Sequence, residues 1–195
     1  MTLEEHDALL KKEGRYEAIK EVQRRREEER QQKVAEWRRA EVPVVEALRA
    51  AGLDVRSVWD LVNTKNRYSA AVPVLLEHVM KPYPERVREG IARALAVPEA
   101  RSGWPILLEA FRREADTTTV GVKWALSLAL GATGTDEMLD DVFALLRDKS
   151  LGENRVPLLQ ILCRSHDPRS VRMLNELKDD KSIGRDAKLA LRNLQ

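Results

Sequence analysis

The chain has 195 residues, of which 43% are hydrophobic, 34% are charged and 5% are aromatic, with a formal net charge of +2 at pH 7. That length is enough for one domain with a buried core, and the single cysteine, Cys163, excludes an intramolecular disulfide and a zinc site built from cysteines. Ala, Leu, Arg and Glu dominate and favour helices over strands, so the composition predicts an all-α protein.

Basic and acidic side chains are balanced along the chain. Residues 1–41 carry 11 of each sign, residues 42–135 carry 12 basic and 10 acidic, and residues 136–195 carry 11 of each. A nucleic-acid binder usually has a basic excess, because neutralising phosphates drives its affinity, so the balance disfavours nucleic acid as a partner. No apolar run approaches the roughly 18 residues of a membrane span. Since the charged N-terminus is also unlike a secretory signal, we expect a cytoplasmic protein with no membrane partner.

Residues 1–41 predict a charged N-terminal helical arm. Apolar side chains keep helical spacing only towards the two ends of residues 15–41, whereas residues 23–33 contain none. A helix that is polar all round cannot pack along its length, so we expect an extended, partly solvated helix that Gly14 separates from a short leading segment. Charge pairs four residues apart support it: Glu21–Arg25 and Glu29–Lys33. This helix either caps or protrudes as a self-neutralised element, or docks or dimerises.

Residues 42–195 repeat with a period of about 32 residues. The five residues at 148–152 recur almost unchanged at 180–184, and residues 87–95 resemble residues 183–191, three periods later. Prolines recur at similar intervals, at Pro43, Pro73 and Pro105. A fixed period of this size is typical of helical repeat proteins.

Each repeat predicts two helices joined by a short polar turn. The first segment opens with proline, which the first turn of a helix tolerates because its missing N–H has no partner there. The second amphipathic segments are residues 87–95, 122–130, 154–162 and 183–191. The turns contain residues that can cap the second helix: Asp148, Ser150, Asp180 and Ser182. One hairpin cannot bury two apolar faces alone, so neighbours are expected to stack into a curved solenoid.

The second segments resemble the second helix of HEAT repeats, in particular the short bacterial form with the pattern V-R-x-x-A-x-x-A-L. The matching residues are Val87, Arg88, Ala94 and Leu95 in one segment and Ile183, Ala187, Ala190 and Leu191 in another, while Ile91 and Gly184 depart from the pattern. The resemblance covers about residues 42–195 and implies a right-handed α-α superhelix of about four to five HEAT-like helical hairpins. The unit around residues 52–63 is the least regular. HEAT-like solenoids are mostly scaffolds and recognition surfaces, although a few bind DNA or act as glycosylases or as lyases on bilin chromophores.

Candidate catalytic residues are few. Cys163 and His166 are three residues apart, and such a pair can form a nucleophile. The nearest carboxylate, Asp167, precedes a proline in an expected turn, and Cys163 suits a small core side chain. The three histidines, at positions 6, 78 and 166, show no metal-ligand spacing. We therefore expect no enzyme activity, no metal and no cofactor.

Residues 131–136 contain two glycines but lack the lysine and the preceding strand of a phosphate-binding loop. They predict a turn between repeats, with Gly131 ending a helix. The acidic cluster that follows lacks the spacing of an EF-hand loop, and it is explained by the preference of carboxylates for the first turn of a helix. Its members are Asp136, Glu137, Asp140 and Asp141.

Basic residues on the second segments are the candidate partner-binding site. In HEAT-like stacks the second helices line the concave face, and guanidinium groups beside an aromatic ring suit an acidic protein segment or a phosphate backbone. The candidates are Arg88, Arg93, Lys123, Trp124, Arg155, Arg185 and Arg192. In the competing interpretation they are solvated and pair with carboxylates of adjacent repeats. The other tryptophans are expected to pack within or between repeats: Trp37, Trp59 and Trp104.

These observations favour a non-enzymatic protein-interaction module that binds a protein partner on its concave face. An adaptor, a regulatory subunit or an immunity-type inhibitor would each fit that description. The alternative is nucleic-acid binding through the basic second-helix positions, in the manner of HEAT-like DNA-repair proteins.

Overall fold

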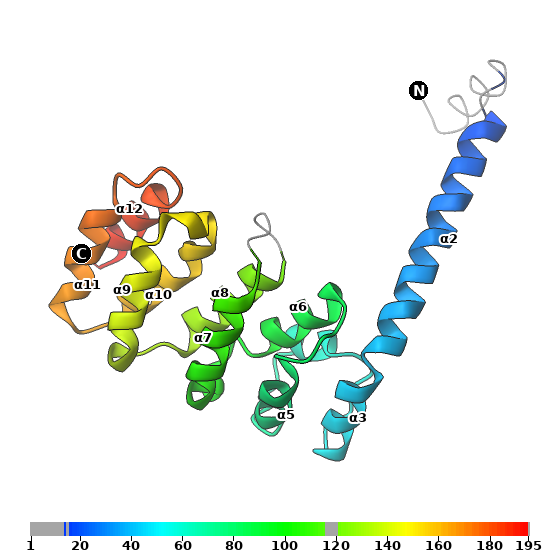
Figure 1. The fold of residues 1–195 in the computed structure, drawn as a ribbon, viewed down its shortest axis with the longest axis horizontal. Coiled ribbons are helices and arrows are strands. Elements are labelled where there is room, and N and C mark those ends of the chain that lie inside the picture. Colours follow the sequence, from blue (N-terminus) through cyan, green and yellow to red (C-terminus); the bar gives the residue numbers. More distant parts are fainter. Residues whose placement is uncertain (1–13, 15, 116–120, 195) are drawn as a thin grey trace. The chain divides into compact units, whose positions relative to one another are not determined.

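The computed structural model describes Gly14, residues 16–115 and residues 121–194. Within these residues every regular element is helical and none is a strand, which confirms the all-α prediction (Figure 1). Contacts divide the chain into two compact units, Met1–Ala40 and Glu41–Gln195. The leading segment expected before Gly14 lies outside the described residues.

The first unit contains helix α2 (Tyr16–Ala40), which has 25 residues and no buried side chain. A long helix is therefore present where one was expected, but its ion pairs differ from the expected ones. Arg24 lies between Glu21 and Glu28, with an N–O distance of 2.7 Å to each carboxylate. Arg30 pairs with Glu27 at 2.7 Å. Pairs three apart as well as four apart join neighbouring turns of the helix surface, so α2 is held by its own charges.

The second unit contains ten α-helices and three 3₁₀ segments among the described residues. The α-helices are α3 (Val42–Ala50), α4 (Trp59–Val62), α5 (Ala71–His78), α6 (Glu85–Ala94), α7 (Trp104–Arg113), α8 (Val122–Thr133), α9 (Leu139–Arg147), α10 (Leu159–Arg164), α11 (Pro168–Leu177) and α12 (Gly184–Asn193). The 3₁₀ segments are η1 (Pro98–Gly103), η2 (Asp136–Met138) and η3 (Lys149–Leu158). The region around residues 52–63 is indeed the least regular, since α4 has only four residues.

The helices of the second unit pack in pairs and in chain order. The two helices of a hairpin contact each other in α5–α6, α7–α8 and α11–α12, and α9 contacts η3, which leads into α10. Each second helix also contacts the next one along the chain, from α4 to α6, α8, α10 and finally α12. The colour sequence of Figure 1 follows this order from cyan to red. Helices from α4 to α12 thus form a continuous row of second helices.

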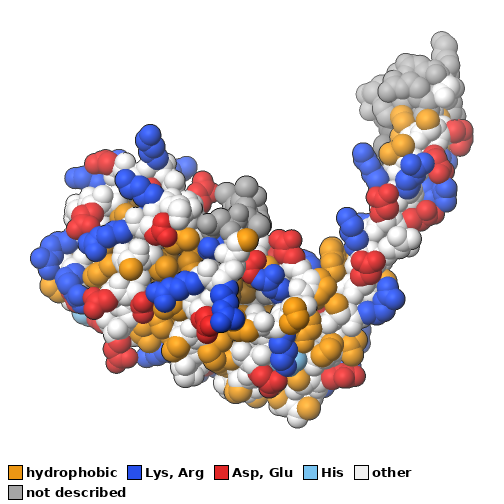
Figure 2. Space-filling model, viewed as in Figure 1, with side chains coloured by type: hydrophobic (Ala, Val, Ile, Leu, Met, Phe, Trp, Pro, Cys, Tyr) orange, Lys and Arg blue, Asp and Glu red, His pale blue; other side chains and the backbone are white. Residues whose placement is uncertain are grey.

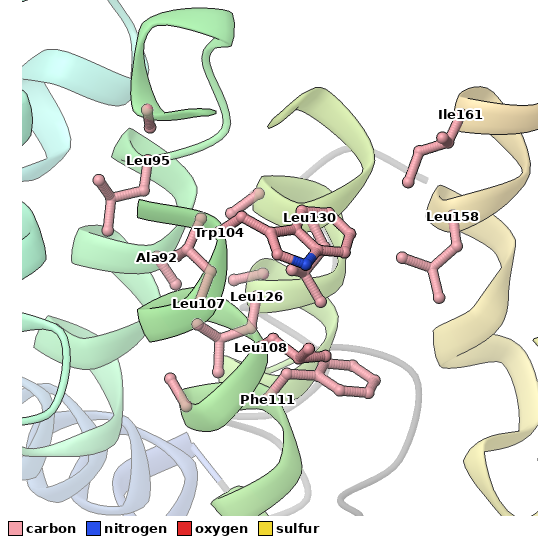
Figure 3. Close-up of a cluster of buried hydrophobic side chains, with 14 of the residues drawn as sticks. Ala92, Leu95, Trp104, Leu107, Leu108, Phe111, Leu126, Leu130, Leu158 and Ile161 are labelled. Carbon is pink, nitrogen blue, oxygen red and sulfur yellow. The ribbon is translucent and has the colours of Figure 1, made fainter. Parts of the chain in front are cut away.

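Apolar side chains from consecutive hairpins fill one core (Figure 3). Trp104 and Phe111 of α7 lie against side chains of α8 and near Leu158 and Ile161 of the next hairpin. Trp104 is 4% exposed, so its expected core position is confirmed. Because no hairpin buries its apolar surface alone, the hairpins of this unit depend on one another for stability.

Proline positions follow the prediction for the first helices. Pro43, Pro73 and Pro105 lie in the first turns of α3, α5 and α7, where a missing N–H leaves no hydrogen bond unmade. Pro168 opens α11 in the same way. Pro157 instead lies in η3, and residues 154–158 therefore form a 3₁₀ segment before the α-helix begins at Leu159.

The prediction that Gly131 ends a helix is wrong. Helix α8 continues through it to Thr133, and Gly134 follows with an extended ψ of 144°. A Cβ atom at position 131 would lie 2.5 Å from the carbonyl oxygen of Pro157. Glycine is therefore needed here because η3 approaches α8 at this point, which the sequence alone does not reveal.

The repeated turns are closed by their aspartates. The Asp148 carboxylate accepts hydrogen bonds from the amide and the hydroxyl of Ser150, at 3.0 and 2.6 Å. The Asp180 carboxylate accepts from the amides of Ser182 and Ile183, at 2.9 and 3.2 Å. These aspartates stabilise the turn before the second helix, whereas Ile183, at the N-cap of α12, makes no side-chain cap.

Candidate functional site

Helix α8 is buried on every side except one. Of its 12 residues, only Trp124, Leu128 and Ala132 are not fully buried. They are four residues apart, so they lie along one stripe of the helix. All three are apolar, and we call them the α8 stripe.

The side chains of the α8 stripe are partly buried, and none of them belongs to the buried core cluster of the described residues. Among the described residues, Trp124 and Leu128 are absent from the partly buried side chains that pack against the core, whereas Trp59 and Val156 belong to them. The outward stripe of a surface helix is normally polar. Partly exposed tryptophan and leucine at these positions are therefore candidates for contact with a partner.

The neighbouring second helices, which contact α8, carry other side chains at the positions equivalent in the repeat to the α8 stripe. Helix α6, which contacts α8, carries the partly buried Glu89 and Arg93, and their side chains form an ion pair at 2.8 Å. On the other side, η3 carries the partly buried Val156 and α10 carries the exposed Gln160. The polarity thus changes across the row, from a compensated ion pair on α6 to apolar side chains on α8.

Helix α12 ends the row with charge and apolar surface combined. Leu189 is 52% exposed, and Arg185 and Arg192 are exposed four residues before and three residues after it. We call the whole set the second-helix face; its members are Glu89, Arg93, Trp124, Leu128, Ala132, Val156, Gln160, Arg185, Leu189 and Arg192.

Two of the predicted cations are committed to ion pairs within the fold. Arg88 pairs with Glu114, which follows helix α7, and both side chains are largely buried. Arg93 pairs with Glu89 one turn before it on the same helix. Both pairs neutralise the charge that a partner would otherwise meet at this end of the row.

Lys123 and Arg155 are buried, with 5% and 1% of their surfaces exposed. The Lys123 ammonium donates to the carbonyl oxygen of Glu114 at 2.9 Å and lies 5.0 Å from the centre of the Phe111 ring. Arg155 donates to the carbonyl oxygen of Leu146 at 2.9 Å. Each carbonyl lies nine residues before its cation, so the same contact is repeated one period apart.

Arg155 also binds the aspartate of the following turn. Its guanidinium donates two hydrogen bonds to the Asp180 carboxylate, at 3.0 and 2.9 Å, and one to the carbonyl oxygen of Gly152 at 3.0 Å. These bonds, joined by those from the Ser182 and Ile183 amides, lower the pKa of Asp180 to about 2. Both Arg155 and Lys123 therefore serve the fold and are removed from the surface on which they were expected.

Of the other predicted site residues, Arg185 and Arg192 are exposed and Trp124 is partly buried. Sequence reasoning missed Leu128, Ala132 and Leu189. Their signal was present, because Leu128 and Ala132 follow Trp124 at intervals of four, and Leu189 lies between two arginines on an amphipathic segment.

On the view in Figure 2, Lys and Arg side chains alternate with Asp and Glu side chains over the second unit. The acidic cluster takes part in this pattern. Asp140 and Asp141 lie in the first turn of α9, as expected, and pair with Arg169 at 2.8 Å and Arg112 at 3.1 Å. Asp136 accepts a hydrogen bond from the amide of His166. These carboxylates therefore tie consecutive turns and helices together.

Cys163 and His166 do not form a catalytic pair in the described part of the chain. Burial raises the pKa of the Cys163 thiol, which disfavours the reactive thiolate. His166 is exposed, and no hydrogen bond joins the two side chains. Asp167 instead caps α11 by accepting from the amide of Arg169 at 2.8 Å. No group of three or more His, Cys, Asp or Glu side chains among the described residues is placed to hold a metal ion.

None of the described helices combines the length and the apolar character needed to cross a lipid bilayer. No protein-family model, no curated protein and no solved structure matches this chain.

Proposed function

We propose that the chain is a non-enzymatic protein-interaction module that binds a protein partner on the second-helix face. In this proposal the hairpins of the second unit form a HEAT-like right-handed solenoid, and the second helices line its concave side. An adaptor, a regulatory subunit and an immunity-type inhibitor all belong to this class.

The α8 stripe is the observation that carries the proposal. Tryptophan is enriched among the residues that dominate binding energy at protein interfaces, and the partly buried Trp124 keeps part of its side chain exposed. Trp124 and Leu128 lie together on a helix whose other sides are already buried. The equivalent positions on the neighbouring helices α6 and α10 are polar or charged, namely Glu89, Arg93 and Gln160. An apolar centre with a polar rim is the usual composition of a protein interface.

The sequence in which the helices contact one another supports the proposed solenoid. Among the described residues, each second helix contacts the next one along the chain, from α4 through α6, α8 and α10 to α12, as stacked repeats do. The buried Arg155 and Lys123 repeat one contact at the interval of the sequence period. A repeated internal contact at a repeated spacing is what stacked equivalent units require.

Nucleic-acid binding receives less support from the same residues. Arg155 and Lys123 are buried, and Arg88 and Arg93 are paired with carboxylates. These four cations therefore do not contribute to a continuous basic ridge, and affinity for a phosphate backbone depends on such a ridge.

Photocrosslinking from the α8 stripe tests the proposal. The photoreactive residue p-benzoylphenylalanine is placed at Leu128 in the full chain, and at Ala144 as a control, because Ala144 is exposed on the first helix α9. After irradiation in cells of the source organism, the Leu128 position is expected to give a discrete protein adduct that the Ala144 position does not give. Equal adducts from both positions, or none from Leu128, would contradict the proposal.

A further inference from the structure

Charge on the second-helix face is compensated at one end and uncompensated at the other. On α6, Arg88 pairs with Glu114, which follows α7, and Arg93 pairs with Glu89. On α12, Lys188 pairs with Asp179 at 3.4 Å. Within the described part of the chain, no carboxylate lies at ion-pair distance from Arg185 or Arg192. Two guanidinium groups therefore flank the exposed Leu189 without a partner of opposite charge.

The apolar centre and the cationic end together define the chemistry of a complementary surface. That surface must cover Trp124 and Leu128 with apolar side chains and place carboxylates near Arg185 and Arg192. Arginine favours carboxylates because its planar donors match both carboxylate oxygens. A basic partner would leave the two guanidinium groups facing like charge, which is unfavourable.

The shape of the surface favours a helical partner over an extended one. An extended peptide satisfies its backbone by joining the edge of a sheet, and the described residues contain no strand. A helix satisfies its own backbone groups and needs only side-chain contacts. The α8 stripe rises about 12 Å over its eight-residue span at 1.5 Å per residue. Apolar side chains at positions i, i+4 and i+7 of a partner helix cover a stripe of similar length.

We propose that the second-helix face binds an acidic amphipathic α-helix of a protein partner. Its apolar stripe packs on Trp124 and Leu128, and its carboxylates pair with Arg185 and Arg192. This inference rests on the proposed function, and it adds the secondary structure and the charge of the segment that is bound.

A display selection with the full chain as bait tests this inference. The probe is a library of 18-residue peptides in which some positions are fixed as alanine to favour a helix and the remaining positions are randomised. Enriched peptides are expected to carry apolar residues at i, i+4 and i+7 and a net negative charge. Enrichment of basic peptides, enrichment of proline-containing extended peptides, or no enrichment above background would overturn the inference.

Variants of the chain then locate the binding of the enriched peptides. Trp124→Ala is expected to weaken binding by about tenfold or more, as for a central interface residue. The double variant Arg185→Glu, Arg192→Glu is expected to weaken it by about threefold to tenfold at low salt, because exposed charge pairs contribute modestly. Ile106→Ala is the matched control, since Ile106 is 39% exposed on the first helix α7. Circular dichroism of each variant establishes that the fold is retained.

If something other than an acidic helix binds the second-helix face, these experiments give different results. Binding that neither Trp124→Ala nor the double arginine variant weakens would overturn the inference. Self-association of the chain that Trp124→Ala abolishes would also overturn it, because the occupant would then be another copy of the chain. A protein adduct at Leu128 together with selected basic peptides would leave the proposed function standing and remove only the acidic helix. The two proposals therefore fail separately.

Discussion

Arg155 of one hairpin binds Asp180 of the next through two hydrogen bonds of 3.0 and 2.9 Å, and their side chains are only 1% and 7% exposed. The same guanidinium holds the carbonyl oxygens of Leu146 and Gly152. A single side chain thus joins the end of α9, the bend in η3 and the turn before α12. This contact fixes the position of one repeat on its neighbour.

Replacing Arg155 with Ala is expected to lower the free energy of unfolding by about 3–5 kcal/mol, because it leaves a buried carboxylate without its partner. Urea denaturation followed by circular dichroism measures this change. Arg147→Ala is the control, since Arg147 and Glu176 form an exposed pair at 3.2 Å, and its cost is expected to stay below about 1 kcal/mol. Equal costs for the two variants would contradict the account of Arg155.

The folded chain is expected to lose stability in acid as Asp180 becomes protonated. Its pKa in the folded chain is about 2, below its ordinary value of 3.8, because Arg155 and two backbone amides hydrogen-bond to the carboxylate. The unfolded chain therefore takes up the proton first, and this stabilisation is complete above about pH 4 and is lost as the pH falls towards 2.

The Asp180→Asn variant isolates this contribution. Its unfolding free energy is expected to be lower than that of the parent chain at pH 7, and the difference is expected to shrink as the pH is lowered from 4 to 2. Denaturation series at these pH values provide the comparison. A difference that stays constant over the whole range would show that ionisation of Asp180 does not contribute to stability.

Alanine substitutions at Gly131 and Gly134 are expected to differ in their cost to stability. At Gly131 a new Cβ would meet the backbone carbonyl of Pro157 at 2.5 Å, whereas at Gly134 it would meet the end of the Ile161 side chain. A side chain can change rotamer, but backbone atoms move only with the whole of η3. Gly131→Ala is therefore expected to cost about 1–3 kcal/mol as an overpacked site, and Gly134→Ala less. Thermal denaturation of both variants checks the order, and the reverse order would be inconsistent with the close approach of η3 to α8.

The helicity of α2 is expected to decrease as the salt concentration rises. Its ion pairs are exposed, and each such pair contributes about 0.3–0.5 kcal/mol at low ionic strength. A peptide of residues 16–40 is expected to be partly helical in dilute buffer and to lose helicity in about 1 M salt, where charges are screened beyond roughly 3 Å. Circular dichroism at 222 nm measures the change. The control Arg24→Gln removes both contacts of Arg24 and should lower the helicity at low salt. Helicity that does not respond to salt would exclude this explanation of α2.

The helices of the fold could be predicted from local patterns. Pro43, Pro73 and Pro105 mark first turns, and apolar spacing marks the segments that follow. These signals are local, because a first turn tolerates proline whatever the rest of the fold does. The all-α fold was predictable for that reason.

The roles of individual side chains could not be predicted in the same way. Arg155 was expected at the surface because it lies on a second segment, and second helices line the concave face in HEAT-like stacks. Its partner Asp180 lies 25 residues further along the chain, so the pairing is not visible in the local sequence. Gly131 was assigned to a helix end because glycine commonly ends helices. Its actual role depends on the close approach of η3 to α8, which is a feature of tertiary packing. Leu128 was overlooked because an apolar residue on a helix is ordinarily part of the core. Burial depends on what packs against each side of a helix, and the sequence of that helix does not contain this information.

The central claim is that the α8 stripe serves a partner and not the fold. Its most direct test is the yield of the protein adduct formed from p-benzoylphenylalanine at Leu128, compared between the parent chain and the Trp124→Ala variant. The account predicts an adduct that decreases by about tenfold or more in the variant, while the free energy of unfolding falls by less than the roughly 3–5 kcal/mol of a core tryptophan, because Trp124 is only partly buried. An undiminished adduct, or a loss of stability comparable to the roughly 3–5 kcal/mol expected for the core substitution Trp104→Ala, would contradict it.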